Sequence, residues 1–301
     1  MGSSFHFSGH ESFQCRNLWL KKGFDFIEQE GGNFNSDEAV LSLGVGKNMT
    51  TSIRYWMEAM GLKTRKKKKK LSELASLIFS DGGWDPYLEN IGSMWLLHYE
   101  LVSNDHASIY NLAFNHFRKH RTEFTKDHLI TFLKNRTSES DKLPADSTLE
   151  TDIGVFVKTY VRPTSHDGRK NIEDQFSSLL LELNLLKEIE EVEITDNEKK
   201  TWYKFETSNQ ESLPNEVLLY AILDNVRYGN SITIQELLNS ENSPGSIFLL
   251  TPDALITKIE ALTLHYDNIV YTDDGGIRQI QIKDKESINP HGVLTDYYGR
   301  S

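Results

Sequence analysis

The stretch between Gly44 and Lys70 constrains the fold more than any other part of the chain. Gly44 and Gly46 mark a tight turn, and residues 47–60 follow with apolar side chains at the spacing of one helix face. These apolar residues are Met49, Ile53, Trp56 and Met60. A glycine ends the helix, and a basic run comes after it. A turn, an amphipathic helix and a basic stretch in this order predict a winged helix-turn-helix, with its wing over residues 63–71.

Basic and polar side chains gather on the predicted recognition helix and in the predicted wing. Backbone N–H groups at a helix start bind phosphate, while Asn and Arg side chains read base edges. The expected DNA-binding residues are Lys47, Asn48, Thr51, Arg54, Lys63, Arg65, Lys66, Lys67, Lys68, Lys69 and Lys70. The alternative is a solvated helix followed by a mobile charged loop, because runs of like charge often have that role. We favour DNA contact, since the basic run adjoins the helix.

The chain as a whole is acidic, which makes this basic run stand out. Its 301 residues carry a formal net charge of -11, and most of the acidic excess lies in residues 136–301. This asymmetry predicts a front half that contacts nucleic acid. The acidic half, residues 136–301, then has a different function or keeps the protein soluble.

Composition excludes several classes of protein. The single cysteine, Cys15, leaves no partner for an internal disulfide and no cysteine-rich metal site. No apolar run approaches the roughly 20 residues that span a bilayer, and the start lacks the pattern of a secretion signal. The two glycines before Lys47 lack the spacing of a phosphate-binding P-loop. We therefore expect a cytoplasmic protein with no membrane association.

We expect a mostly α-helical fold with small β wings, divided into three domains. Residues 1–90 are the winged-helix DNA-binding domain, in which the segment 71–79 is either a short helix or a closing strand. Residues 91–206 form a helical central domain, with an apolar stripe at helical spacing from Ile172 to Leu186. Residues 207–301 form a C-terminal winged-helix-like domain.

Turn and cap signals support the second winged helix. Helices are predicted over residues 215–226 and 234–238, and Thr251-Pro252-Asp253 opens a third with an N-cap and a proline at the first helical position. A hairpin over residues 269–282 follows, turned by an Asp-Gly pair. This domain lacks a basic run, so we interpret it as a module for protein–protein contact or dimerisation.

Two small polar groups are candidates for catalysis. Asp85 and Glu89 stand four residues apart beside a turn, a spacing at which two carboxylates hold Mg²⁺ or Mn²⁺. His10 and Glu11 offer a base with an orienting carboxylate, or a pair of metal ligands. Both groups also have a structural interpretation. Asp85 is suited to capping a helix, and the two adjacent residues do not share a face and suit a hydrogen-bonded turn.

Longer motifs connect the chain to a known family. They are Phe7–Phe13 (FSGHESF), Trp19–Gly23 (WLKKG), Leu43–Met49 (LGVGKNM), Ile53–Trp56 (IRYW), Gly83–Glu89 (GWDPYLE) and the segment Glu173–Leu185. With these motifs the chain resembles the bacterial domain-of-unknown-function family that includes SspB, a component of the single-stranded DNA phosphorothioation and anti-phage defence system. The resemblance covers nearly the whole chain.

The resemblance implies a DNA-nicking endonuclease that opens one strand so that partner proteins install sulfur. The implied partners are DNA, a cysteine desulfurase and a reductase-like sulfurtransferase, and a homodimer stays open. A single cysteine agrees with sulfur chemistry that belongs to a partner. The alternative, from another class, is a non-catalytic DNA-binding adaptor that recruits the sulfurtransferase through its acidic back half. The absence of a recognisable nuclease motif favours the adaptor, and the resemblance favours the nickase.

Overall fold

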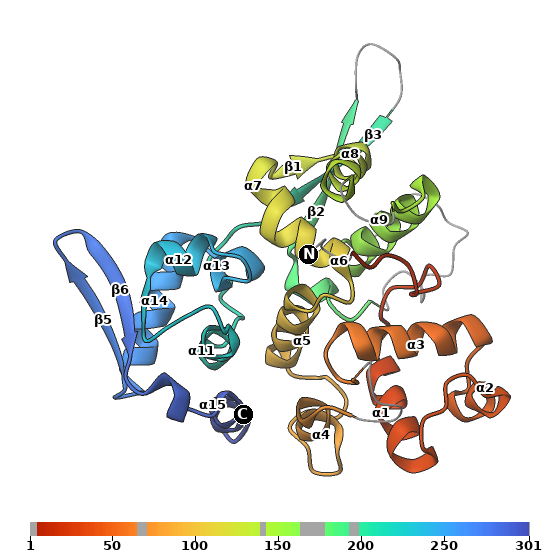
Figure 1. Ribbon diagram of the computed structural model, residues 1–301, viewed down its shortest axis with the longest axis horizontal. Coiled ribbons are helices and arrows are strands. Elements are labelled where there is room, and N and C mark those ends of the chain that lie inside the picture. Colours follow the sequence, from red (N-terminus) through yellow and green to blue (C-terminus); the bar gives the residue numbers. More distant parts are fainter. Residues whose placement is uncertain (1–4, 65–70, 139–142, 163–177, 193–198, 301) are drawn as a thin grey trace. The chain divides into compact units, whose positions relative to one another are not determined.

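The computed structural model describes residues 5–64, 71–138, 143–162, 178–192 and 199–300 (Figure 1). The chain forms two compact units. Unit 1 comprises Met1–Glu89 with Glu100–Glu206, and unit 2 comprises Asn90–Tyr99 with Thr207–Ser301. Helices make up most of the regular structure, and two small three-stranded sheets supply the rest. The predicted mostly α-helical fold with small β elements is confirmed, while the division into three domains stays a prediction.

Unit 1 begins with three helices that pack on one another: α1 (Trp19–Glu30), α2 (Asp37–Leu43) and α3 (Lys47–Ala59). α2 ends at Gly44, whose φ of 63° is left-handed backbone that glycine adopts without strain. α3 buries Ile53, Trp56 and Met57 completely. The apolar spacing of residues 47–60 therefore predicted this helix and its buried side correctly.

The chain after α3 returns to pair with itself. Lys63 and Leu71 form an antiparallel bridge, at the two ends of the segment predicted as the wing. Helix α4 (Glu73–Phe79) follows, and the Ser72 hydroxyl caps it by accepting the Ala75 N–H at 3.1 Å. This cap explains why the segment is a helix, which settles the alternative that the sequence left open.

The middle of unit 1 is mostly helical (Figure 1), and aromatic side chains form its core. Helix α6 (Ser108–Asn111), the π-helical segment η1 (Leu112–Phe117) and α7 (Arg118–His120) follow one another, and α8 (Lys126–Thr137) and α9 (Asp146–Tyr160) come next. The ring of Phe114 packs edge-on against those of Phe156, Tyr160 and Phe205, at centroid distances of 5.4 to 6.2 Å. These contacts join helices to the sheet of unit 1.

That sheet has three antiparallel strands in the order β1-β3-β2: β1 (Glu123–Phe124), β2 (Leu186–Val192) and β3 (Lys199–Phe205). A 3₁₀ turn, η2 (Leu181–Leu183), precedes β2. The helical stripe predicted from Ile172 to Leu186 begins outside the described residues, and its last part is wrong. Leu186 instead starts a strand, because its backbone pairs with Phe205, a long-range partner that helical spacing does not reveal.

Unit 2 combines the first part of α5 (Ile91–Ser103) with the C-terminal segment. Its other elements are α11 (Asn215–Asp224), β4 (Ser231–Thr233), α12 (Ile234–Asn239), α13 (Pro244–Ile247), α14 (Pro252–Thr263), β5 (Ile269–Asp274), β6 (Ile277–Ile282), η3 (Lys285–Ser287) and α15 (Pro290–Tyr298). The sheet order is β4-β6-β5, and the β5–β6 hairpin extends from it (Figure 1). The helices and hairpin predicted for this segment are all present.

The core of unit 2 depends on α5. Trp95 is fully buried, its ring lies edge-on to that of Phe248 at 5.8 Å, and its indole N–H donates to the Ser212 hydroxyl at 3.2 Å. Tyr99 donates to the Asp224 carboxylate of α11 at 2.8 Å. Residues 90–99 are therefore a structural part of unit 2, although they precede most of unit 1 in the sequence.

None of the helices in the described part of the chain combines the length and apolar character that crossing a bilayer requires. Helix α9, for example, has only 15 residues, where a transmembrane helix needs about 20.

Candidate nucleic-acid interface

The N-terminal end of α3 presents a polar stripe to solvent. Lys47 and Asn48 are exposed, and Thr51 and Arg54 are half-buried. Lys47, Thr51 and Arg54 share one helix face because they are spaced by four and three residues. Gly46 precedes the helix and brings no capping side chain. The first N–H groups of α3 therefore lie beside exposed basic and polar side chains, an arrangement that suits a phosphate.

Glycine at position 46 is not required by the fold. Its φ of -66° is open to any residue, and an added Cβ would meet no atom within 4 Å. The small residue instead leaves the start of α3 accessible, which allows a ligand to approach the backbone closely.

The other predicted DNA-binding residues differ in how exposed their charged groups are and in which side chains those groups contact. The Arg54 guanidinium donates to the Asn35 side-chain oxygen at 2.8 Å, which holds it at the surface. The Lys63 ammonium lies on the Glu58 carboxylate, and only 10% of its side chain is exposed. Because Glu58 neutralises it, Lys63 is a poorer phosphate ligand than Lys47. Arg65 and Lys66, Lys67, Lys68, Lys69 and Lys70 lie outside the described residues.

The opposite side of α3 is covered by the N-terminal segment, residues 5–16. The Ser52 hydroxyl donates to the His10 carbonyl at 3.0 Å, and the Trp56 indole N–H donates to the Phe13 carbonyl at 3.1 Å. Tyr55 is buried there, with its ring edge-on to that of His10 at 5.5 Å. Tyr55 is not part of the apolar stripe that predicted this helix, and it is buried because the N-terminal segment covers it.

His10 has both ring nitrogens engaged inside unit 1. Nδ1 accepts the Ser12 N–H at 3.1 Å, and Nε2 lies 3.0 Å from an oxygen of Asp152 on α9. Since a backbone N–H can only donate, Nδ1 carries no proton, and Nε2–H is the donor to Asp152. In this arrangement His10 has no lone pair left for a substrate proton or a metal. Its contacts tie the N-terminal segment to α9.

Asp152 is the residue of this group that sequence reasoning missed. It is 1% exposed, and its two oxygens also receive the Ser8 N–H at 3.0 and 3.1 Å. His10 and Asp152 are 142 positions apart in the chain, so no local motif joins them. One signal was present: an acid on the apolar side of a helix, beside Leu149 and Ile153. Glu11, the predicted partner of His10, is exposed.

Asp85 closes a turn after α4. Its side chain is buried, and one carboxylate oxygen accepts the Glu89 N–H at 2.9 Å. The Glu89 side chain is exposed. The turn therefore engages one oxygen of the Asp85 carboxylate. Across the described ranges, no group of three His, Cys, Asp or Glu side chains is placed to hold a metal. The assignment of metal to this pair stays a prediction.

Two solved structures are similar to the whole chain. Each has a TM-score of 0.83 and aligns with 99% of this chain and 89% of the other chain. One is a magnesium ion-bound SspB crystal structure, 24% identical in sequence, and the other is an SspB crystal structure, 25% identical. No curated protein matches the sequence. The family model described as protein of unknown function (DUF4007) matches residues 7–298. The chain therefore belongs to the DUF4007 family, and the resemblance expected from its motifs is confirmed.

Proposed function

We propose that this protein is a DNA-binding component of a phosphorothioation-based anti-phage defence system in the cytoplasm. The observation that carries DNA binding is the polar stripe at the start of α3, where Lys47 and Asn48 stand exposed beside an uncapped helix end. The likeness to two SspB structures supports the place in such a system.

In this proposal, α1 to α3 and the segment that follows form a winged helix-turn-helix. Lys47 and the first N–H groups of α3 bind a backbone phosphate, while Asn48 and Arg54 contact base edges. The proposed wing between Lys63 and Leu71 adds phosphate contacts that carry no sequence information. Binding should therefore weaken steeply as salt concentration rises.

We further propose that the protein nicks one strand of the bound duplex. Water attacks a backbone phosphorus, one phosphorus–oxygen bond breaks, and the released oxygen takes a proton. Mg²⁺ or Mn²⁺ is the proposed cofactor, because one of the two similar SspB structures holds a magnesium ion. The nick would expose a strand end to a cysteine desulfurase and a reductase-like sulfurtransferase.

The second candidate function is a DNA-binding adaptor without catalysis. It is favoured by the engagement of two predicted catalytic side chains, since His10 is bonded to Asp152 and Asp85 to the Glu89 backbone. In this case unit 2, proposed as a second winged helix, docks the sulfurtransferase or a second copy of the chain. Its β5–β6 hairpin presents the exposed acid Asp274 for such a contact, while the neighbouring Asp273 pairs with Arg278 at 2.9 Å.

One experiment separates the two functions. Purified protein is incubated with supercoiled plasmid, with and without Mg²⁺, and conversion to the open circle is followed on a gel. Binding to a labelled duplex is measured in parallel by fluorescence anisotropy. Lys47→Ala is compared with Lys158→Ala, an exposed lysine on α9, as the control. Binding with metal-dependent nicking supports the nickase, and binding without nicking supports the adaptor. Equal binding by wild type and Lys47→Ala would refute the proposed interface.

A further inference from the structure

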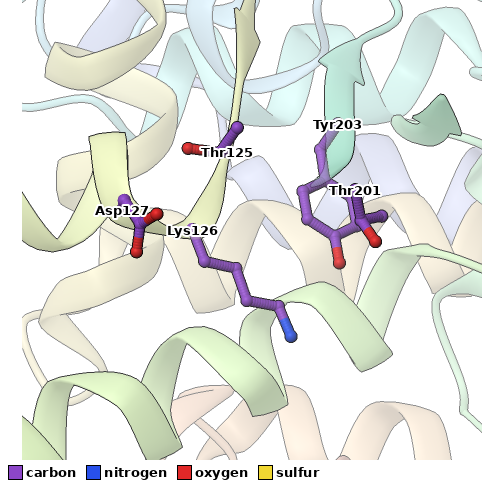
Figure 2. A pocket seen from close by; sticks show the side chains of 5 residues that line it. All are labelled: Thr125, Lys126, Asp127, Thr201 and Tyr203. Atoms are coloured by element: carbon purple, nitrogen blue, oxygen red, sulfur yellow. The ribbon is translucent and has the colours of Figure 1, made fainter. Parts of the chain in front are cut away.

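A small depression lies between the start of α8 and strand β3 in unit 1 (Figure 2). It has a volume of about 190 Å³ and is lined by Thr125, Lys126, Asp127, Thr201 and Tyr203. The short strand β1 brings the two elements together, because Phe124 pairs with Tyr203 and Thr125 follows directly. Segments far apart in the sequence thus form one polar site.

The start of α8 leaves backbone donors available. The Thr125 hydroxyl accepts the His128 N–H at 3.4 Å, and the His128 ring in return accepts the Thr125 N–H at 3.2 Å. This reciprocal cap does not use the N–H groups of Lys126 and Asp127, which have no acceptor within the helix. The 12-residue helix also places the positive end of its dipole here.

Tyr203 gives a second and independent indication of a ligand. Only 4% of this residue is exposed, yet it lines the depression, and Figure 2 shows its side chain together with that of Thr201. Within the described ranges, the Tyr203 hydroxyl has no hydrogen-bond partner. Burial, and to a lesser degree the charge of Glu188, raises the pKa of Tyr203 to about 12. The hydroxyl therefore stays protonated at neutral pH and can donate a hydrogen bond to a ligand in the depression.

The charges and donors of the other lining side chains indicate which kind of acceptor fits the depression. In the part of the chain that the structure describes, Lys126 makes no ion pair and Thr201 no side-chain hydrogen bond. One ammonium, two hydroxyls and two backbone amides therefore surround the depression as donors. Two carboxylates oppose them: Asp127 in the lining and Glu188, which is the strand partner of Tyr203. The site is also smaller than the roughly 300–1,000 Å³ pockets of drug-sized ligands, so it suits a compact group.

We infer that this depression binds a phosphate group, supplied either as the free anion or as the phosphate of a mononucleotide. Lys126 provides the counter-charge, and the α8 amides, Thr201 and Tyr203 donate hydrogen bonds to the phosphate oxygens. Asp127 repels the anion and weakens its binding. The site does not rest on the proposed DNA contact, because it uses no residue of α3.

Calorimetric titration of the full-length protein at low ionic strength tests the site. The three probes are inorganic phosphate, thymidine monophosphate and thymidine. We expect one equivalent of either phosphate-bearing probe to bind and thymidine not to bind. If only the monophosphate binds, a nucleotide is the source, and if only the free anion binds, inorganic phosphate is. Absence of binding by both, or equal binding of thymidine, would overturn the inference.

Four variants assign binding to these side chains. Tyr203→Phe keeps the packed ring and removes the hydroxyl, so affinity should fall about tenfold, and Thr201→Val should have a similar effect. Lys126→Ala should reduce affinity further, whereas Asp127→Asn should increase it. Lys158→Ala is the matched control and should change nothing. Unfolding midpoints confirm that each variant is folded. Unchanged affinity in Tyr203→Phe together with Asp127→Asn would place the phosphate elsewhere and refute the site.

Discussion

The bond between His10 and Asp152 allows the structural and catalytic interpretations of His10 to be separated by measurement. The Asp152 carboxylate is 1% exposed and receives the Ser8 N–H at 3.0 and 3.1 Å and the His10 ring N–H at 3.0 Å. Asp152→Ala removes the acceptor and leaves the buried His10 ring N–H without a partner, whereas Ser8 is an exposed residue. His10→Ala leaves the buried Asp152 carboxylate without its ring donor, which costs about 3–5 kcal/mol, whereas Asp152→Ala leaves only a neutral donor unpaired, which costs about 1–3 kcal/mol. The first cost is a large part of the roughly 5–15 kcal/mol that stabilises a domain.

The assay is a double-mutant cycle in urea. Free energies of unfolding are measured by circular dichroism for the wild type, His10→Ala, Asp152→Ala and the double variant. We expect His10→Ala to destabilise unit 1 by about 3–5 kcal/mol and Asp152→Ala by about 1–3 kcal/mol, and the double variant to lose less than the sum by about 1–3 kcal/mol. Nicking and DNA binding per folded molecule, measured well below the unfolding midpoint, should change less than about twofold. The reasoning is refuted if His10→Ala loses under about 1 kcal/mol of stability while nicking falls about 10²-fold or more, since that pattern marks a catalytic base.

Three further predictions address unit 2 and the α3 interface. Burial lowers the pKa of His98 to about 4, so the unfolded chain takes up its proton first as pH falls through 6.5. The free energy of unfolding should therefore be independent of His98 above pH 6.5 and should fall by about 3 kcal/mol between pH 6.5 and pH 4. Urea titrations across this range should show that decrease in the wild type and not in His98→Gln. Arg54→Ala should cost about 1–3 kcal/mol of binding on a preferred site and less on random duplex, by anisotropy, if it reads a base; equal losses would reduce it to a phosphate contact. Trp95→Ala should destabilise unit 2 by about 3–5 kcal/mol in calorimetry, and a loss under about 1 kcal/mol would show that α5 is dispensable there.

The sequence predicted those parts of the fold that depend on local signals. α3 was recognised from apolar residues at helical spacing between glycines, and α14 from Thr251 with a proline after it. The β5–β6 hairpin followed from its Asp-Gly turn. In each case neighbouring residues determine the conformation, so a single sequence is sufficient.

Long-range contacts set the limit of what could be predicted. The burial of Tyr55 could not be predicted, because nothing near it in the sequence indicates that the N-terminal segment covers it. Leu186 was assigned to a helix because its strand partner, Phe205, lies much further along the chain, at the end of β3. The donors at Lys126 and Tyr203 belong to α8 and β3, which are far apart in the sequence and are brought together by β1 and by the contact of His128 with Trp202. A candidate site whose residues come from several elements can be recognised only in the structure. A helix start such as that of α3 can be recognised from the sequence.

Because the first part of α5 contributes core residues to unit 2, it also limits how the family can evolve by recombination. A crossover between residues 206 and 207 would exchange the C-terminal segment of unit 2, but Trp95 and Tyr99 of the same unit would still come from the original parent. A transplanted segment would then have to fit Phe248 and Asp224 equivalents against a helix from another parent. At the sequence divergence seen between this chain and the SspB structures, such a mismatch would create cavities or unmade hydrogen bonds. The C-terminal segment and residues 90–99 should therefore be inherited together, and functional chimaeras should be recovered only when both come from the same parent.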